Sequence, residues 1–514
     1  MNIGVLVFAG GAALMALELI GSRVLAPYFG NSIFVWGSLI GMFMAALAGG
    51  YYVGGRLADR WPSRRLLEGI ILTAGLSILA VPVYSGAFTA WVAGLGLGPK
   101  MGPLLAAMAL FAVPSLLLGT LSPFALKLRT RDIAVIGNTA GGLYALSTAG
   151  SIAGTFATAF WLIPVFNVRT VLQVLGAALA VLAGTDLAVT ARRKGPTAFI
   201  VLLVVVALTA ASPLGAMVGS AFPRERVLFD RETLYHHVRV VDAGDSRFLR
   251  FDNSWQSGMY LSDPDRARFT YTDFFHLALV WNPRPKDALF IGLGGGSAPK
   301  KFLASYPDLR VDVAEIDPVV IAVAREFFGV PGDGPRLKVA AEDGRLFLKG
   351  TAKTYHFIAV DAYYADAVPF HLFTREFFAL AGRRLKPDGV LAINVIASFK
   401  GEHSHLFRSV YRTVAEVFPE VYLFAVPVDQ TESPGSIDPE LQRNIILVAT
   451  KGAGKTDPEE VQRRAAELAG DGTFKSEALA VYAGYLYDAS SIRTDDVPVL
   501  SDDYAPVDSL LHLK

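Results

Sequence analysis

Long apolar runs dominate the first 220 residues and limit what this part of the chain can fold into. A helix needs about 20 mostly apolar residues to cross a bilayer, because lipid satisfies no backbone N–H or C=O group. Only five Asp or Glu residues occur in these 220 positions, which argues against seven core helices of a soluble protein. We therefore expect a membrane α-helical bundle of about seven spans over residues 1–220. The runs are residues 3–21, 33–54, 67–86, 102–125, 134–163, 170–190 and 198–217.

The Lys and Arg residues between these runs predict the orientation of the bundle. The second, fourth and sixth loops hold ten of them, whereas the other three loops hold three. Because positively charged loops stay in the cytoplasm, we expect a multi-pass protein of the cell (inner) membrane with a cytoplasmic N-terminus. Seven spans would then place everything after residue 220 outside the cell.

The remainder of the chain has a different composition. Residues 1–220 carry 13 Lys+Arg and 5 Asp+Glu, a net charge of +8, and the remaining 34 and 41 give −7. Cysteine is absent, which excludes disulfides, zinc–thiolate sites and cysteine nucleophiles. We expect a small β subdomain at residues 221–284 and a Rossmann-like α/β domain at residues 285–514, in which carboxylates carry any reaction. We expect no metal ion and no nucleic-acid partner.

Alternation of apolar and polar residues marks the small β subdomain. It runs through residues 235–241 and again through residues 247–256. Ala243-Gly244-Asp245 interrupts it between the two segments. Period-two alternation on both sides of a glycine turn predicts a β-hairpin.

After residue 285, short apolar runs separated by helical stretches predict a parallel sheet. The run 288–291 leads directly into a glycine-rich loop that begins at Gly292 and includes Gly294. Such glycines let the backbone turn sharply and approach a ligand closely. The next strand, 311–315, ends at Glu315, 21 residues after Gly294. An acid at that spacing is typical of a group that binds ribose hydroxyls.

Two further strands end in acidic residues. Residues 337–340 lead to Asp343 and Gly344, and residues 356–360 lead to Asp361. Ligands of open α/β sheets bind outside the carboxyl ends of the strands. The pattern therefore predicts a nucleoside site that brings Glu315, Asp343 and Asp361 together.

At these residues the chain resembles the spermidine synthase (polyamine aminopropyltransferase) family, in its bacterial type fused behind a multi-span membrane region. The similarity covers about residues 230–400. It includes Phe251-Asp-Asn-Ser-Trp-Gln256, Phe269-Thr-Tyr271 and Leu385-Lys-Pro-Asp-Gly389, besides the three acids. The resemblance implies transfer of an aminopropyl group from decarboxylated S-adenosylmethionine to an amine such as putrescine, with release of methylthioadenosine.

The resemblance also implies roles for individual residues. Asp361 matches the general base of the family. The positions expected to bind the co-substrate are Gln256, Gly292, Gly294, Glu315, Asp343 and Gly344. The positions expected around the amine are Tyr235, Tyr271, Tyr364 and Asp366. As partners we expect a small polyamine or other amine, the lipid bilayer and a second copy of the chain in a dimer.

The chain departs from the family pattern on the amine side. Gly295 stands where the glycine loop of the family has an Asp. Tyr364 stands where the family has a second Asp, three residues after the base, and Thr272 stands where it has the Gln that follows the acceptor-site tyrosine. Two other functions therefore stay open. One is a nucleoside- or polyamine-binding sensor or transport-coupled module without turnover, and the other is an S-adenosylmethionine-dependent methyltransferase. Supply of decarboxylated S-adenosylmethionine favours a cytoplasmic active site, in conflict with the loop charges.

Overall fold

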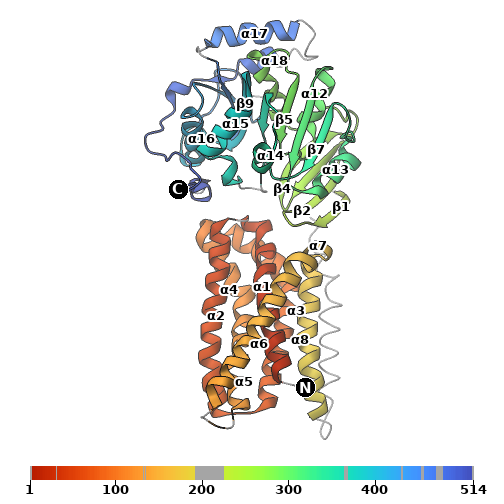
Figure 1. The fold of residues 1–514 in the computed structure, drawn as a ribbon, viewed down its shortest axis with the longest axis vertical. Helices are drawn as coiled ribbons and strands as arrows, with labels where there is room; N and C mark the ends of the chain where they lie inside the picture. The colour runs from red at the N-terminus through yellow and green to blue at the C-terminus, as the bar shows by residue number, and fades with distance from the viewer. Residues whose placement is uncertain are drawn as a thin grey trace. The chain divides into compact units, whose positions relative to one another are not determined.

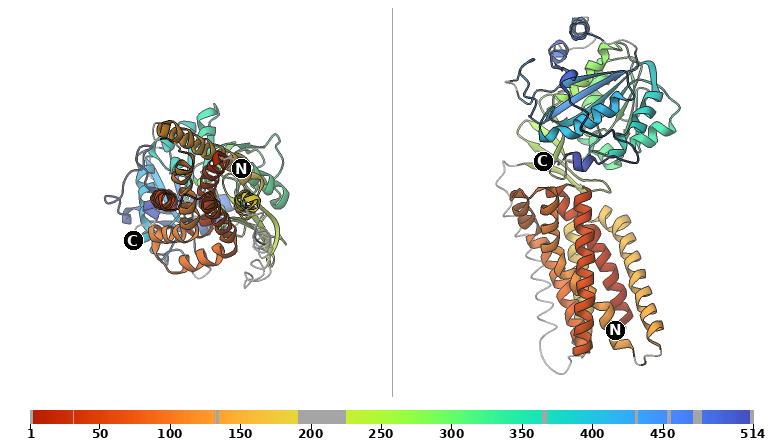
Figure 2. Two further views of the ribbon diagram at one scale, coloured as in Figure 1. Left: turned by 90° about the horizontal axis from the view of Figure 1, so that it is seen from below. Right: turned by 90° about the vertical axis from the view of Figure 1, so that its left-hand side faces the viewer.

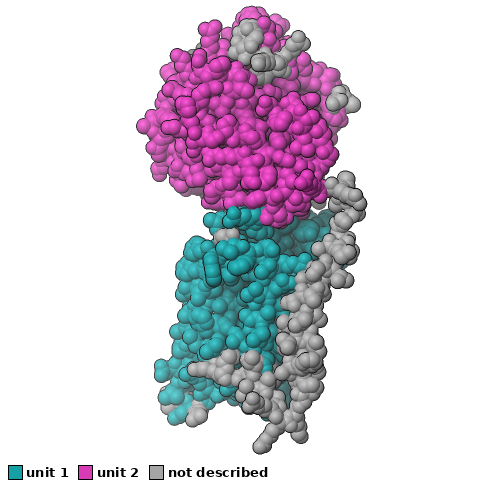
Figure 3. Space-filling model, turned by 90° about the vertical axis from the view of Figure 1, so that its right-hand side faces the viewer, with its two compact units in different colours: residues 1–224, 231–234 teal, residues 225–230, 235–514 magenta. Residues whose placement is uncertain are grey.

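The computed structural model divides into two compact units (Figure 3). The first comprises residues 1–224 with 231–234, and the second comprises residues 225–230 with 235–514. The structure describes residues 3–30, 32–130, 132, 135–190, 225–363, 368–429, 432–452, 456–470 and 478–511. The expected apolar run at 198–217 lies outside these residues.

The first unit is a set of helices that lie side by side, as Figure 1 and the right-hand view of Figure 2 show. Helices α1 with α6, α2 with α4, and α3 with α8 pack most extensively. The helices are α1 (Ile3–Phe29), α2 (Ile33–Arg60), α3 (Arg64–Gly94), α4 (Gly98–Gly119), α5 (Leu121–Arg129), α6 (Ile136–Ala157), a π-helical turn (Thr158–Leu162), α7 (Ile163–Val165) and α8 (Val168–Thr190).

Within the described residues four helices, not seven, are long and apolar enough to cross a membrane. They are Ile3–Phe29, Ile33–Arg60, Arg64–Gly94 and Lys100–Arg129. The run expected at residues 134–163 contains α6, which is rich in Gly, Ser and Thr and is not among these four helices. In α8 the apolar stretch is shorter, Val168–Gly184.

The small residues of α6 let it approach α1 closely. A Cβ atom placed on Gly154 would lie 2.3 Å from the carbonyl oxygen of Ala12, and one on Gly150 would lie 2.1 Å from that of Phe8. Such contacts allow backbones to pack without intervening side chains, as in associated transmembrane helices. The sequence of α6 thus reflects helix packing more than overall hydrophobicity.

The second unit begins with a four-stranded antiparallel sheet in the order β1-β2-β3-β4. Its strands are β1 (Arg226–Glu232), β2 (His237–Ala243), β3 (Ser246–Phe251) and β4 (Ser254–Tyr260). The hairpin turn at Gly244 is confirmed. Reading 247–256 as one strand is wrong, because Asp252 turns the chain with φ +54°. Asp tolerates this left-handed conformation better than most residues, and Gln256 consequently lies on β4.

The main sheet has eight strands in the order β12-β10-β11-β9-β8-β5-β6-β7. The five strands from β9 to β7 run parallel, and β11, β10 and β12 add antiparallel pairs beyond β9. This is the expected Rossmann-like α/β domain. The strands are β5 (Asp287–Ile291), β6 (Arg310–Glu315), β7 (Leu337–Ala341), β8 (Tyr355–Val360), β9 (Leu385–Ala397), β10 (Glu420–Ala425), β11 (Arg443–Thr450) and β12 (Leu486–Tyr487).

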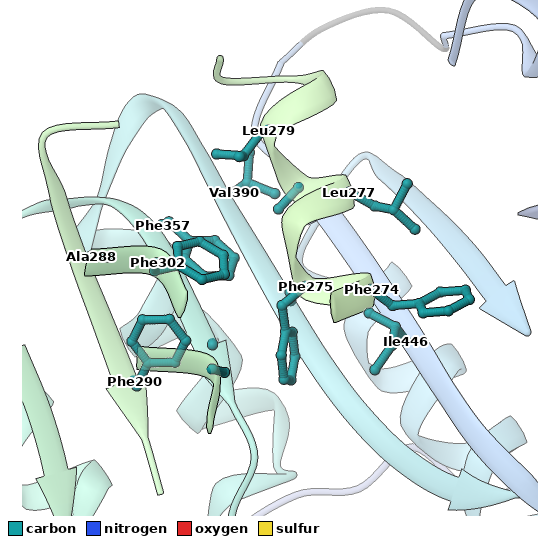
Figure 4. Packing of buried hydrophobic residues seen from close by; sticks show 14 of the residues in the cluster. Phe274, Phe275, Leu277, Leu279, Ala288, Phe290, Phe302, Phe357, Val390 and Ile446 are labelled. Atoms are coloured by element: carbon teal, nitrogen blue, oxygen red, sulfur yellow. The ribbon is translucent and has the colours of Figure 1, made fainter. Parts of the chain in front are cut away.

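Hydrophobic side chains cover both faces of this sheet, because successive residues of a strand point to opposite sides. Phe290 and Phe357 join one core with Phe302 of α12, and the rings of Phe302 and Phe357 stack with centroids 5.2 Å apart (Figure 4). The alternate residues Leu289 and Ile358 join the other core. The helices are α11 (Tyr271–Phe274), α12 (Ser297–Ser305), α13 (Pro318–Phe328), α14 (Gly344–Gly350), α15 (Arg375–Arg384), α16 (His405–Ala415), α17 (Pro458–Gly470), α18 (Ala478–Ala483) and α19 (Val507–Leu511).

Candidate active site

A cavity of about 210 Å³ lies where four adjacent parallel strands, β7, β6, β5 and β8, reach their carboxyl ends. Eight of the residues expected in the site line it: Gln256, Tyr271, Gly292, Gly294, Glu315, Asp343, Gly344 and Asp361. Tyr235 is not among the lining residues, although the neighbouring His236 is. Tyr364 and Asp366 lie outside the described residues.

The glycine loop after β5 is shaped by close backbone contacts. Gly292 has φ +97°, and a Cβ atom there would lie 2.1 Å from the carbonyl oxygen of Asp361. Asp361 in turn donates its backbone N–H to the carbonyl oxygen of Ile291 at 2.9 Å. The loop and the segment carrying the expected base therefore touch through their backbones at the junction of β5 and β8.

Ser257 of β4 packs against the glycine loop at position 295. The backbone N–H of Gly295 donates to Ser257 Oγ at 2.8 Å. A Cβ atom on Gly295 would lie 2.9 Å from Ser257 Cβ and 3.1 Å from Phe328 Cδ1. Two neighbouring side chains thus occupy the space that a family-type aspartate would need.

Glu315 anchors the same loop from the end of β6. Its Oε2 accepts the backbone N–H of Leu293 at 2.9 Å, and its Oε1 accepts that of Asp317 at 3.0 Å. The residue is 7% exposed, and burial raises the pKa of its carboxyl group. The backbone N–H of Gly294 also contributes, so about one of the roughly four lone-pair sites of the carboxylate is left for a hydroxyl group of a ligand.

Asp343 caps the first turn of α14. Its Oδ1 accepts the backbone N–H groups of Arg345 and Leu346 at 3.0 Å each, and its Oδ2 contacts His371 Nε2 at 2.8 Å. Burial alone would raise its pKa, but these hydrogen bonds outweigh burial and lower it. Nothing in the sequence pattern had indicated His371, which comes 28 residues later.

The C-terminal segment is clamped beside this aspartate. Arg345 binds Asp502 through two hydrogen bonds of 2.7 and 2.5 Å, and Thr374 donates to the same carboxylate at 2.7 Å. Arg345 also donates to the carbonyl oxygen of His371 at 3.0 Å. The chain end thus supports the residues that surround Asp343.

Replacement of Asp502 by alanine is expected to weaken methylthioadenosine binding about three- to tenfold. Arg345 would lose a bidentate, partly exposed ion pair, which is worth on the order of 1 kcal/mol. Calorimetric titration of the purified protein measures this change. The matched control is the exposed neighbour Asp503→Ala, and an equal loss in both variants would contradict a specific role of the clamp.

Asp361 is held by hydrogen-bond donors on both carboxylate oxygens. Tyr271 donates its hydroxyl to Oδ2 at 3.0 Å, and Asn394 donates Nδ2 to Oδ1 at 2.9 Å. Burial raises the pKa of Asp361, and the two hydrogen bonds oppose that rise. Burial and the neighbouring carboxylate raise the pKa of Tyr271 well above its usual value, so the phenol stays a donor.

A second, wider chamber of about 940 Å³ adjoins this cavity and shares six lining residues with it. The loop between β10 and β11 forms one wall, held by Arg443, whose guanidinium binds Glu432 at 2.7 and 2.8 Å. Thr272 is turned inward, and its hydroxyl donates to the carbonyl oxygen of Phe269 at 3.1 Å. Within the described residues no cluster of three His, Asp or Glu side chains could hold a metal ion.

Comparison with known proteins supports the assignment of the second unit. The spermine/spermidine synthase domain model matches residues 269–435. A polyamine aminopropyltransferase of Vibrio vulnificus is 32% identical over 237 residues, which is 44% of this chain and 75% of that relative. A probable polyamine aminopropyl transferase of Bifidobacterium longum is 26% identical over 315 residues, 60% of this chain and 67% of that relative.

The crystal structure of spermidine synthase from Thermotoga maritima matches with a TM-score of 0.39 and 22% identity, over 51% of this chain and 85% of that one. The sequence match carries the family assignment, because it combines 32% identity with three quarters of the relative's length. The chain belongs to the spermidine synthase (polyamine aminopropyltransferase) family and is a transferase of this type.

Proposed function

We propose that this enzyme moves an aminopropyl group from decarboxylated S-adenosylmethionine to an amine such as putrescine, and releases methylthioadenosine. The observation that carries the proposal is the position of Asp361. Asp361 lines the smaller cavity, and Tyr271, which donates its hydroxyl to Asp361, lines both this cavity and the wider chamber. The cavity suits the nucleoside of the donor, and the chamber suits the acceptor amine.

The reaction requires a base beside the acceptor. A free alkyl amine has a pKa of roughly 10.4 and is protonated at neutral pH, so it is not nucleophilic. Ionised Asp361 would first bind the ammonium group and then accept a proton as the nitrogen attacks. A C–N bond forms at the carbon next to the sulfonium and the C–S bond breaks, which leaves a neutral thioether. The remaining catalysis would come from alignment of nitrogen, carbon and sulfur.

Recognition of the donor's own ammonium group must differ from the family pattern. Gly295 offers no side chain, and Ser257 occupies the adjacent space. Tyr364 and Asp366 stay predictions for this role. A dimer also stays a prediction.

We further propose that the four long apolar helices anchor the enzyme in the cell membrane, with the N-terminus in the cytoplasm. Their length and composition support this proposal. The side of the membrane on which the catalytic unit lies depends on how many times the chain crosses the membrane before residue 225. The supply of the donor favours the cytoplasmic side. Reporters fused after Lys514, one active only in the cytoplasm and one only outside it, would decide the side.

The activity is tested with the purified full-length enzyme. Donor labelled in the aminopropyl group is incubated with a panel of diamines and polyamines, and methylthioadenosine and the labelled amine are quantified. We expect both products in equal amounts with at least one amine. Methylthioadenosine binding without release from the donor by any amine would support the sensor alternative. Transfer of labelled methyl from S-adenosylmethionine would support the methyltransferase alternative.

A further inference from the structure

A buried asparagine, Asn394, and a partly buried one, Asn444, form a hydrogen-bonded chain beside Asp361. Asn444 of β11 donates Nδ2 to Oδ1 of Asn394 at 3.0 Å, and Asn394 of β9 donates Nδ2 to Oδ1 of Asp361 at 2.9 Å. Asn444 pairs with Ile396 across the two antiparallel strands, and Asn394 pairs with Ile446. The asparagines are thus diagonal neighbours on one face of the sheet, close enough for their side chains to meet.

The charge of Asp361 sets the direction of this chain. An ionised carboxylate only accepts hydrogen bonds, so Asn394 must present its NH₂ group to Asp361 and its oxygen to Asn444. Asn444 must then donate. Asn394 is 1% exposed, so the orientation of its amide depends on Asp361 and Asn444, its two side-chain partners. Without Asn444 the Asn394 amide could turn its oxygen toward the carboxylate, which would repel it.

The start of β11 is rigidly held, which fixes Asn444. Its carbonyl oxygen accepts the N–H of Val426 at 3.1 Å. The preceding residue, Arg443, is 4% exposed and binds Glu432 and the carbonyl oxygen of Asp438. The Arg443 ion pair lowers the pKa of Glu432 and so keeps it charged. Asn444 therefore has a firm backbone from which to orient Asn394.

We propose that Asn444 is a positioning residue for Asp361, acting through the amide of Asn394. The proposal rests on the proposed function, in which Asp361 binds the acceptor ammonium and takes its proton. The relay holds one carboxylate oxygen in place and favours the charged form of Asp361 against the cost of burial. Tyr271 does the same at the other oxygen.

The test replaces Asn444 with leucine, which has a similar shape but no donor. We expect kcat to fall about tenfold, and the acidic limb of the kcat–pH profile to move up by about one pH unit, because the carboxylate loses a charge-stabilising hydrogen bond. Methylthioadenosine affinity should stay within about twofold. The matched control is Asn282→Leu, which removes another buried amide, one bound to Asp388. It should leave the pH profile unchanged.

A double-mutant cycle tests whether Asn444 acts on Asp361 only through Asn394. If Asn444 acts only through Asn394, the Asn394→Ala/Asn444→Leu enzyme should be no slower than Asn394→Ala alone. Fully additive losses, or a raised KM for the amine with an unchanged pH profile, would overturn the proposal. Asn444→Asp keeps the side-chain size but removes the donor when ionised, and serves if the leucine variant fails to fold.

A readout without turnover keeps this proposal separate from the proposed function. The infrared band of a protonated carboxyl group that disappears in Asp361→Asn reports the protonation of Asp361. Its pH midpoint should be higher in Asn444→Leu than in the unchanged enzyme. An unchanged midpoint contradicts the relay, whereas absence of transfer by the unchanged enzyme with every amine contradicts the proposed function.

Discussion

Asp361→Asn is expected to lower the rate of aminopropyl transfer about a thousandfold, while methylthioadenosine affinity changes less than about threefold. General-base catalysis by a positioned side chain contributes roughly 10²–10⁴-fold, and an amide cannot accept the proton. Asp361 follows β8, whereas Glu315 and Asp343, which we propose to bind the nucleoside, lie at the ends of β6 and β7. Single-turnover kinetics with labelled donor and calorimetry with methylthioadenosine measure the two effects.

The pH dependence supplies an independent check. Burial raises the pKa of Asp361 above the usual value of an aspartate. Because the base must be ionised, the rate should rise with pH through that raised pKa, and residual transfer by Asp361→Asn should lack this limb. The control is Asp312→Asn on β6, where Lys353 and Tyr355 bind the carboxylate. This variant should be less stable but should keep the limb, and the same rate loss in both would count against a specific role of Asp361.

Gly292→Ala is expected to have the second large effect, a loss of methylthioadenosine affinity of at least tenfold together with a lower Tm. A residue with φ +97° is strained by roughly 1–2 kcal/mol when it carries a Cβ atom. That Cβ would also lie 2.1 Å from the carbonyl oxygen of Asp361, so the glycine loop and the base segment must separate. Calorimetry and thermal unfolding measure both changes.

Gly329→Ala separates the cost of backbone strain from the cost of the contact with Asp361. Gly329 ends α13 with φ +70°, and a Cβ atom there meets nothing within 4 Å. It should lose about 1 kcal/mol of stability and keep methylthioadenosine affinity. Equal effects at positions 292 and 329 would show that conformational strain alone, and not the contact with Asp361, explains the loss.

Local patterns predicted the Rossmann-like part of the fold well. The apolar run 288–291 and the glycines after it correspond to β5 and the loop at its end. The place of Asp361 after β8 could also be predicted. A buried parallel strand appears in the sequence as a short apolar run, and Asp361 is the polar residue at the end of that run. Hydrophobicity was a poorer guide in the first unit, where α6 packs through glycine contacts.

Contacts between distant segments could not be predicted. Asn394 could have been noticed as one polar residue inside the apolar run of β9, but its partner Asn444 comes 50 residues later and meets it only through antiparallel pairing of β9 with β11. Arg345 and Asp502 are 157 residues apart. The turn at Asp252 is local, and the Asp-Asn pair could have indicated it.

The contact between Ser257 and the glycine loop restricts how this enzyme can change. The loop follows a strand of the large sheet, whereas Ser257 belongs to β4 of the small one. An acidic residue at position 295 therefore requires its neighbours to shift, since its Cβ atom would lie 2.9 Å from Ser257 Cβ and 3.1 Å from Phe328 Cδ1. The small sheet thus constrains the loop of the large sheet, and we expect the loop sequence of a relative to fit this chain better when the residue at position 257 is changed with it.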